Sequence, residues 1–350
     1  MLVVGGGTAG HVVPAIPVMQ LLLEQGHRLS FVGSRSGLEP ALLSDVELTY
    51  HGIATGKLRR YWSWQNLMDV FRVGLGTLQA LWLLMRDRPH VVFSKGGFVS
   101  FPVVFAAWLL RIPVVAHESD LSPGLANRLV LPFLRTLCTS FAETADNIAS
   151  DKFRVLHTGT PIRPDILHGD AGRGRAQLEI NSDKPLLVIT GGSLGADVLN
   201  DIARAAAAEL ATTYAVLHVC GAGKTVSLQV PDYQQREYIS EGWGDILAAA
   251  DVVVSRAGAN ALFELLALGK LNLLVPLPKA SSRGDQLENA AFAEAQGYSA
   301  VVAQETLNPT GLVEALRTLQ GRRAEYQRQL ATFECPPAAT AIAAEINRFL

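Results

Sequence analysis

Three glycine-rich turns, at residues 5–10, 94–98 and 191–195, each stand between an apolar stretch and a helical pattern. Such a turn presents backbone N–H groups at the positive end of a helix dipole, which suits an anion. His11 follows the first turn directly. A lone histidine at a helix start is more often a capping or packing residue, but this one adjoins a turn that should face a ligand. Its imidazole is therefore a candidate for proton transfer near neutral pH.

A fourth stretch, residues 251–270, combines a buried strand, a small-residue turn and a helix. Gly258 in the turn leaves room for a close-lying ligand. The helix is expected to begin near Asn260 and to end at Gly269, which places Glu264 in its first turns. This carboxylate has two interpretations: it complements the helix dipole, or it accepts hydrogen bonds from a sugar diol.

Strands and helices alternate along the chain, and this alternation predicts parallel, doubly wound sheets. We expect strands at 1–4, 28–32, 90–93, 113–116, 186–190 and 252–254, and helices at 14–25, 102–110 and 260–269. The same pattern begins again after residues 159–164, so a domain boundary is expected near Arg163. The prediction is two similar α/β domains facing a cleft, 1–163 and 164–335, with a terminal helix at 336–350 that packs on the first.

Composition narrows the class of protein. A chain of 350 residues usually forms two domains, and 49% hydrophobic residues can fill two cores. The net charge of −2 argues against a nucleic-acid binder, although residues 1–163 carry 15 Lys+Arg against 11 Asp+Glu. Three widely spaced cysteines suit neither a zinc site nor a disulfide framework, and a reducing cytoplasm fits them best. The first residues do not have the pattern of a signal peptide.

The first turn also matches G-x-G-x-x-G through Gly5, Gly7 and Gly10, so a dinucleotide site has to be weighed. A NAD site calls for an acidic residue after the second strand, where this chain has Ser34 and Arg35. A second phosphate-type turn at 191–195 has no role in a single dinucleotide-binding unit. An oxidoreductase is therefore disfavoured.

Residues 57–111 are rich in aromatic and basic side chains. The expected helix at 70–86 carries Leu75 and Trp82, and Trp108 extends the same patch. Only 13 uncharged residues separate Arg72 from Arg86, too few for a transmembrane helix. Two interpretations stay open: burial against the sheet, or a helix in the bilayer interface with its arginines on anionic headgroups.

Motifs in order along nearly the whole chain resemble glycosyltransferase family 28, in its peptidoglycan-synthesising branch. They are 6–11 (GGTAGH), 96–100 (GGFVS), 117–118 (HE), 123–127 (PGLAN), 191–193 (GGS), 256–259 (RAGA) with Glu264, and 285–286 (DQ) with Asn289. The resemblance implies a GT-B fold, an acceptor site on the first domain and a site for UDP-N-acetylglucosamine on the second.

Carried over by position, the resemblance implies roles for individual residues. Glu264 would hold the ribose hydroxyls, Gln286 the sugar hydroxyls, and Ile239 would lie beside the uracil. Ser193 and residues 259–261, at the start of the helix that carries Glu264, would face the diphosphate, with Arg163 also in the donor site. The donor set is completed by consecutive residues of this helix: Ala259, Asn260, Ala261, Leu262 and Phe263. On the acceptor side the set is Thr8, Ala9, Gly10, Asp120 and Asn127, with His11 as general base.

The implied reaction is an inverting transfer of N-acetylglucosamine to the C4 hydroxyl of lipid I, undecaprenyl-diphospho-N-acetylmuramoyl-pentapeptide. Neither a cofactor nor a metal is expected, since no Asp-x-Asp pair is present. The enzyme is expected at the cytoplasmic face of the cell membrane, on anionic phospholipid and near the cell-wall synthesis machinery. Alternatives are another lipid acceptor such as diacylglycerol, or a non-catalytic UDP-sugar-binding paralogue.

Four positions depart from the family pattern: Ala9, Ser119-Asp120, Thr160 and residues 281–284. Asp120 is the most doubtful carry-over, because a carboxylate accepts but does not donate hydrogen bonds. These departures make the acceptor less secure than the donor.

Overall fold

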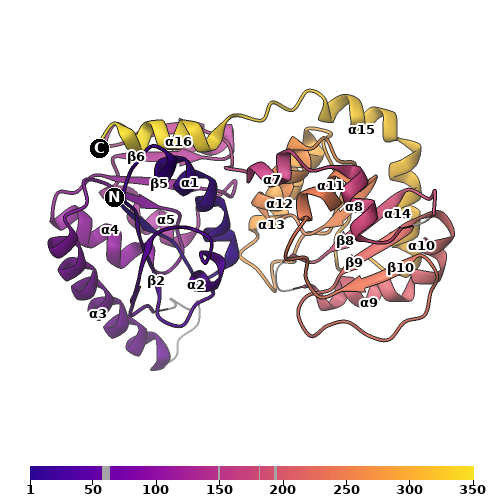
Figure 1. Cartoon of the computed structure of the whole chain (residues 1–350), viewed down its shortest axis with the longest axis horizontal. Helices are drawn as coiled ribbons and strands as arrows, with labels where there is room; N and C mark the ends of the chain where they lie inside the picture. Colours follow the sequence, from indigo (N-terminus) through magenta and orange to yellow (C-terminus); the bar gives the residue numbers. More distant parts are fainter. Residues whose placement is uncertain (57–63, 149, 181, 193–194) are drawn as a thin grey trace. The chain divides into compact units, whose positions relative to one another are not determined.

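The computed structural model describes residues 1–56, 64–148, 150–180, 182–192 and 195–350. The chain forms two compact units, Met1–Pro161 with Pro336–Leu350, and Ile162–Cys335. Each unit is a parallel sheet covered by helices (Figure 1). The predicted fold class of two parallel α/β domains is therefore confirmed; their arrangement around a cleft stays a prediction.

The first unit holds a seven-stranded parallel sheet in the order β3-β2-β1-β4-β5-β6-β7. Its strands are β1 Leu2–Val4, β2 Ser30–Ser34, β3 Thr49–Ile53, β4 Val92–Ser94, β5 Val114–Glu118, β6 Thr136–Thr139 and β7 Arg154–His157. The residues of β1, β4, β5 and β6 are all buried, as expected when helices cover both faces of a parallel sheet.

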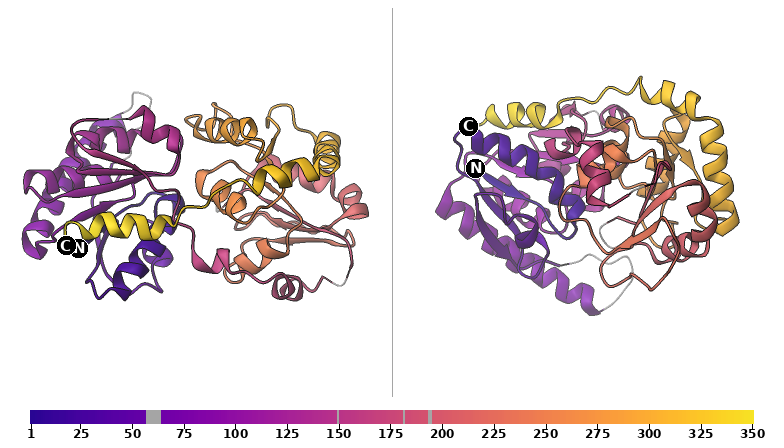
Figure 2. Two further views of the ribbon diagram at one scale, coloured as in Figure 1. Left: turned by 90° about the horizontal axis from the view of Figure 1, so that it is seen from above. Right: turned by 45° about the vertical axis from the view of Figure 1, so that its right-hand side comes forward.

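Helices form two layers around this sheet. They are η1 Ala9–His11, η2 Val13–Ala15, α1 Ile16–Glu24, α2 Glu39–Leu42, α3 Trp64–Asp87, α4 Ser100–Leu109, α5 Leu125–Val130, η3 Leu131–Phe133, α6 Ala142–Asn147 and α16 Ala338–Asn347. On one face α3 and α4 pack with the apolar side chains of the central strands. On the other, α1 and α16 pack side by side (Figure 2).

The C-terminal helix α16 is fixed to the first unit by apolar and polar contacts. Ile342 and Ile346 are fully buried in a cluster that includes residues of α1. Glu345 is 3% exposed and accepts hydrogen bonds from Thr136 Oγ1 at 2.7 Å and from Arg154 Nη1 at 3.2 Å. The end of the chain therefore completes the core of the unit in which it begins.

The second unit holds a six-stranded parallel sheet in the order β10-β9-β8-β11-β12-β13. Its strands are β8 Leu186–Thr190, β9 Ala215–Val219, β10 Tyr233–Arg236, β11 Val252–Ser255, β12 Asn272–Leu274 and β13 Ala300–Val301. Its helices are α7 Pro164–Leu167, α8 Ala171–Gln177, α9 Asp197–Ala205, α10 Ala207–Thr213, α11 Trp243–Ala249, α12 Ala259–Ala267, α13 Asp285–Ala295, α14 Pro309–Gly321 and α15 Arg323–Leu330.

The apolar helix α3 differs from the prediction. It spans Trp64–Asp87 rather than 70–86, and residues 68–87 are long and apolar enough to cross a membrane by length and composition alone. Length and composition alone therefore do not exclude a membrane span. One face, with Leu83 and Leu84, packs on the sheet core, whereas Phe71 is 69% and Trp82 60% exposed. Burial against the sheet therefore accounts for one face of the helix and not for the other.

Candidate functional site

In each sheet all strands are parallel, but the order in which the chain adds them reverses between one pair of neighbouring strands. In the first unit this topological switch lies between β1 and β4, and in the second between β8 and β11. Loops at the carboxyl ends of such a pair diverge and leave a crevice in which ligands bind. The three glycine-rich turns and the turn at 256–258 all follow these four strands. Sequence spacing thus located both crevices.

In the second unit, the turns after β8 and β11 leave open space. Gly192 has a φ of +80°, and no atom would lie within 4 Å of a Cβ added there or at Gly258. Gly258 caps α12 with no side-chain hydrogen bond to the helix amides. The positive end of α12 is therefore accessible to an anion between the two turns.

Glu264 is the sixth residue of α12, not a first-turn residue. Because the dipole effect fades beyond the first turn, the interpretation as a helix-stabilising charge loses its basis. The side chain leans back toward the start of the helix. Burial raises the pKa of Glu264 to about 7, with Asp165 adding to the rise and Arg163 opposing it.

Arg163 is the nearby cation. Its Nη1 lies 3.6 Å from Asp165 Oδ2, and its buried Nε has no hydrogen-bond partner. A buried guanidinium nitrogen without an acceptor is unusual, since unpaired buried donors are costly. The charge of Arg163 therefore acts on Glu264, and the Arg163 Nε has capacity for a ligand.

Buried polar groups hold this crevice in shape. Arg256 is 6% exposed and donates to Val275 O at 2.9 Å and Gln304 Oε1 at 2.6 Å. Asn289 on α13 donates to Ala257 O at 3.1 Å. These side chains connect the turn after β11 to the segment after β12 and to α13, so they hold the turn in its conformation.

The remaining donor-side predictions differ in burial and in hydrogen bonding. Gln286 Oε1 accepts from Leu277 N at 3.0 Å, which leaves its amide nitrogen as the group to meet a hydroxyl. Leu262 and Phe263 are buried in the core, so their side chains serve packing. Ile239 is partly exposed after β10, and Asn260 and Ala261 are partly exposed in the first turn of α12. Ser193 lies outside the described residues.

In the first unit, the loops after β1 and β4 touch. A Cβ on Gly97 would lie 2.0 Å from Gly6 O, and Gly97 has a φ of +87°, so only glycine fits. A Cβ on Gly96 would lie 3.2 Å from both His11 Cδ2 and Asn127 Oδ1. The first and second glycine turns, His11 and Asn127 therefore meet at one place, as predicted for an acceptor site.

A carboxylate missed by sequence reasoning occupies the inner side of the first turn. Glu39 is 1% exposed and accepts from Gly7 N at 3.0 Å and from Ser34 Oγ at 3.1 Å. Ser34 ends β2, where a dinucleotide-binding protein would contact a ribose. Because Ser34 and Gly7 are already paired with a negative charge inside the protein, the fold has no room there for a cofactor phosphate.

His11 Nδ1 lies 2.8 Å from Thr8 Oγ1.

Asp120 N and Gly124 N donate to the buried Glu118 carboxylate at 3.0 and 2.9 Å, and Asn127 Nδ2 donates at 2.8 Å. Asn127 thus orders Glu118. Ala9 and Gly10 are the first two residues of η1, which ends at His11. The position of Glu118 directly after an apolar stretch, at a strand end, was the signal that could have singled it out.

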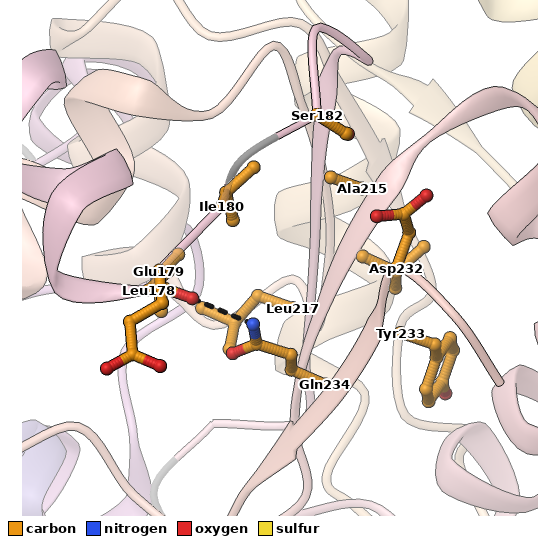
Figure 3. A pocket seen from close by; sticks show the side chains of 10 residues that line it. Leu178, Glu179, Ile180, Ser182, Ala215, Leu217, Asp232, Tyr233 and Gln234 are labelled. Atoms are coloured by element: carbon orange, nitrogen blue, oxygen red, sulfur yellow. Dashed lines mark hydrogen bonds between the residues drawn. The ribbon is translucent and has the colours of Figure 1, made fainter. Parts of the chain in front are cut away.

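A cavity of about 370 Å³ lies elsewhere in the second unit (Figure 3). Its lining includes Ala215 and Tyr233, the first residues of β9 and β10, and Gln234, which donates to Leu178 O. It therefore lies at the amino ends of the strands, away from the crevice. Among the described residues, no group of three or more His, Cys, Asp or Glu is placed to hold a metal.

Two parallel α/β domains with glycine turns at both switch points define a glycosyltransferase of the GT-B class. The structure is similar to the crystal structure of MurG from Acinetobacter baumannii, with a TM-score of 0.77, 26% identity and 99% of each chain covered. Residues 1–139 match the glycosyltransferase family 28 N-terminal domain, and residues 186–342 match its C-terminal domain. The chain belongs to glycosyltransferase family 28, and the predicted resemblance is confirmed.

Curated relatives match over nearly their whole length. A protein of Legionella pneumophila (strain Lens) is 43% identical over 98% of this chain and 95% of its own. A protein of Clostridium kluyveri is 43% identical over 100% and 99%. Both are named UDP-N-acetylglucosamine–N-acetylmuramyl-(pentapeptide) pyrophosphoryl-undecaprenol N-acetylglucosamine transferase.

Proposed function

We propose that this glycosyltransferase moves N-acetylglucosamine from UDP-N-acetylglucosamine to the C4 hydroxyl of lipid I, and so forms lipid II for peptidoglycan. The observation that carries the proposal is the end-to-end identity of 43% with relatives named for this reaction. The two crevices support it, because each holds the groups that one of the two substrates requires.

The second unit would bind the donor. A ribose diol can donate two hydrogen bonds to Glu264, and such bonds favour the ionised carboxylate, so donor binding would lower the raised pKa of Glu264. The amide nitrogen of Gln286 would meet the sugar. The start of α12 and Arg163 would stabilise the negative charge of departing UDP without a metal.

The first unit would bind the acceptor and supply the base. For His11 Nε2 to take the proton from the C4 hydroxyl, its lone pair must be free, which puts the ring proton on Nδ1. Nδ1 then donates to Thr8 Oγ1, 2.8 Å away. Thr8 would thus orient the imidazole ring and accept from its reactive tautomer, as the partner of a general base does.

A membrane-facing surface would bring the enzyme to its lipid substrate. Phe71, Leu75, Leu78 and Trp82 on α3 are between 50% and 69% exposed, and Trp108 on α4 is 48% exposed. Arg86 Cζ lies 4.8 Å from the centre of the Trp82 ring. Exposed apolar side chains beside arginines suit peripheral insertion into an anionic bilayer interface.

The test compares acceptors. Purified protein with UDP-N-acetylglucosamine should release UDP when lipid I is added and should show no increase with diacylglycerol. Release with diacylglycerol instead would favour transfer to another lipid. Absence of release with both, together with UDP-sugar binding in a thermal shift assay, would favour a non-catalytic binding protein.

A further inference from the structure

Lys95 is a buried cation at the acceptor crevice to which the reaction above gives no role. It follows β4 directly and precedes Gly96 and Gly97. Its side chain is 1% exposed, and Nζ lies 2.5 Å from Ser119 Oγ. Lysine is almost never fully buried unless its charge is compensated, so the surroundings of Nζ have to explain it.

The compensating charges come from the segment after β5. The carboxylates of Glu118 and Asp120 both act on Lys95 to keep it protonated, against burial, which lowers its pKa to about 8. His117 does not compete, because burial and Lys95 together hold the pKa of His117 well below its usual range, and it bonds Gly159 O at 2.9 Å. Lys95 is therefore a buried cation under the influence of two carboxyl groups, and burial together with Asp120 raises the pKa of one of them, Glu118.

These charges belong to the loop that borders the reacting centre. The Glu118 carboxylate holds the loop by accepting hydrogen bonds from Asp120 N and Gly124 N. It accepts a third from Asn127 Nδ2. Asn127 also lies against Gly96, whose other neighbour is the His11 ring. The charge on residues 118–120 therefore contributes to the electrostatic potential at the place where the acceptor would lie.

An anionic acceptor would be repelled by two carboxylates at this place. Coulomb energies at the edge of a protein are large enough to change affinity severalfold when one charge is removed. Buried ion pairs contribute little net stability compared with apolar side chains in place of both partners, so stability of the fold alone does not account for Lys95.

We propose that Lys95 is a specificity-determining positioning residue for the acceptor: its ammonium holds Ser119 and offsets the charge of Glu118 and Asp120, so that residues 119–124 admit a diphosphate-bearing lipid. This inference rests on the proposed function. It also accounts for Ser119 and Asp120, two of the departures from the family pattern, as partners of Lys95.

The experiment compares four proteins: wild type, Lys95→Met, Asp120→Asn and the double variant. With saturating UDP-N-acetylglucosamine at pH 7, Lys95→Met should raise KM for lipid I about tenfold. The double variant should return it to within about threefold of wild type, since removing the Asp120 charge removes the need for the cation. KM for the donor should stay within about twofold in all four.

The pH profile adds a readout that a purely structural lysine would not change. Lys95 loses its proton as the pH rises through about 8, so kcat/KM for lipid I should fall there in the wild type. The double variant should lack this fall. Lys184→Met serves as control, because Lys184 bonds Ala211 O and Asp232 in the second unit and should leave KM for lipid I unchanged.

Equal impairment of Lys95→Met and the double variant, or no change in either, would overturn the inference. Hydrogen exchange without substrate separates this failure from that of the function. The amides of Asp120 and Gly124 should exchange faster in Lys95→Met and be slowed again in the double variant. If wild type does not use lipid I, the proposed function fails, and unchanged exchange rates would sink the role of Lys95 independently.

Discussion

We propose that two side chains, Glu264 and His11, carry the chemistry, and the environment of each supports its role. Glu264 is a carboxylate held at a raised pKa next to one cation, which makes it sensitive to a ligand that donates hydrogen bonds. His11 has one nitrogen engaged with Thr8. The two lie in different units, one for each substrate.

Replacing Glu264 by Gln should weaken donor binding and stabilise the free protein above pH 7. A carboxyl whose pKa rises from 4.5 to about 7 on folding binds more protons folded than unfolded, so stability falls as the pH rises between these values. The loss amounts to about 3 kcal/mol at most. Thermal unfolding at pH 5 and pH 8 should show the variant ahead only at pH 8.

In the same variant, the Kd for UDP-N-acetylglucosamine should rise at least tenfold, since two charge-assisted hydrogen bonds are weakened. Glu314→Gln, an exposed change on α14, is the matched control and should alter neither quantity. Unchanged donor affinity in Glu264→Gln would return this residue to a structural role.

Replacing His11 by Ala should lower kcat about 10²- to 10⁴-fold with little effect on donor KM, because general-base catalysis contributes on this scale. Thr8→Val should lower kcat less, and Thr8→Ser should retain it, because a hydroxyl at this position holds the imidazole ring in its orientation. Initial rates with both substrates saturating measure this. Wild-type turnover by His11→Ala would remove the base assignment.

At the scale of elements, the switch points could be predicted because glycine turns follow strands in a readable pattern. Seven strands were not expected: β3, β6, β7, β9, β10, β12 and β13. Of these, β3, β7, β10 and β13 are short and carry polar or partly exposed residues. Glu39 was not singled out, and Glu118 and Lys95 appeared only as parts of a motif and a turn, because their partners are distant in sequence or a loop away. Burial and hydrogen bonding, which the fold creates, distinguish them from ordinary surface charges.

The amphipathic helix α3 should bind the membrane together with α4. Changing both Trp82 and Trp108 to Ser removes two exposed aromatic side chains and should reduce co-sedimentation with vesicles containing anionic phospholipid at least severalfold. Tyr238→Ser, which removes a 61% exposed aromatic side chain from the second unit, is the control. Unreduced binding by the double variant would show that this surface does not contact the bilayer.

The attachment of α16 makes a separate prediction about stability. Glu345→Ala should lower the free energy of unfolding by about 1 to 3 kcal/mol, because Thr136 and Arg154 lose a buried acceptor. Denaturant unfolding would measure this loss. Glu334→Ala, at an exposed position before α16, should change stability by less than about 0.5 kcal/mol. Equal effects of the two changes would show that the buried network adds nothing.

At the scale of the whole molecule, the chain forms two parallel α/β units, and the residues at the topological switch differ between them. The first presents a histidine, close-packed glycine turns and a compensated carboxylate loop. The second presents an accessible helix start, an arginine and a titratable glutamate. This division matches an uncharged hydroxyl nucleophile on one unit and a nucleotide leaving group on the other.

The central claim is that this protein joins N-acetylglucosamine to the C4 hydroxyl of lipid I. Mass spectrometry of the lipid product decides it most directly, with UDP-N-acetylglucosamine as donor and lipid I or its 4-deoxy-muramoyl analogue as acceptor. The account predicts that lipid I gains one N-acetylhexosamine and the 4-deoxy analogue gains none. Addition of the sugar to the 4-deoxy analogue, or unmodified lipid I beside released UDP, would contradict it.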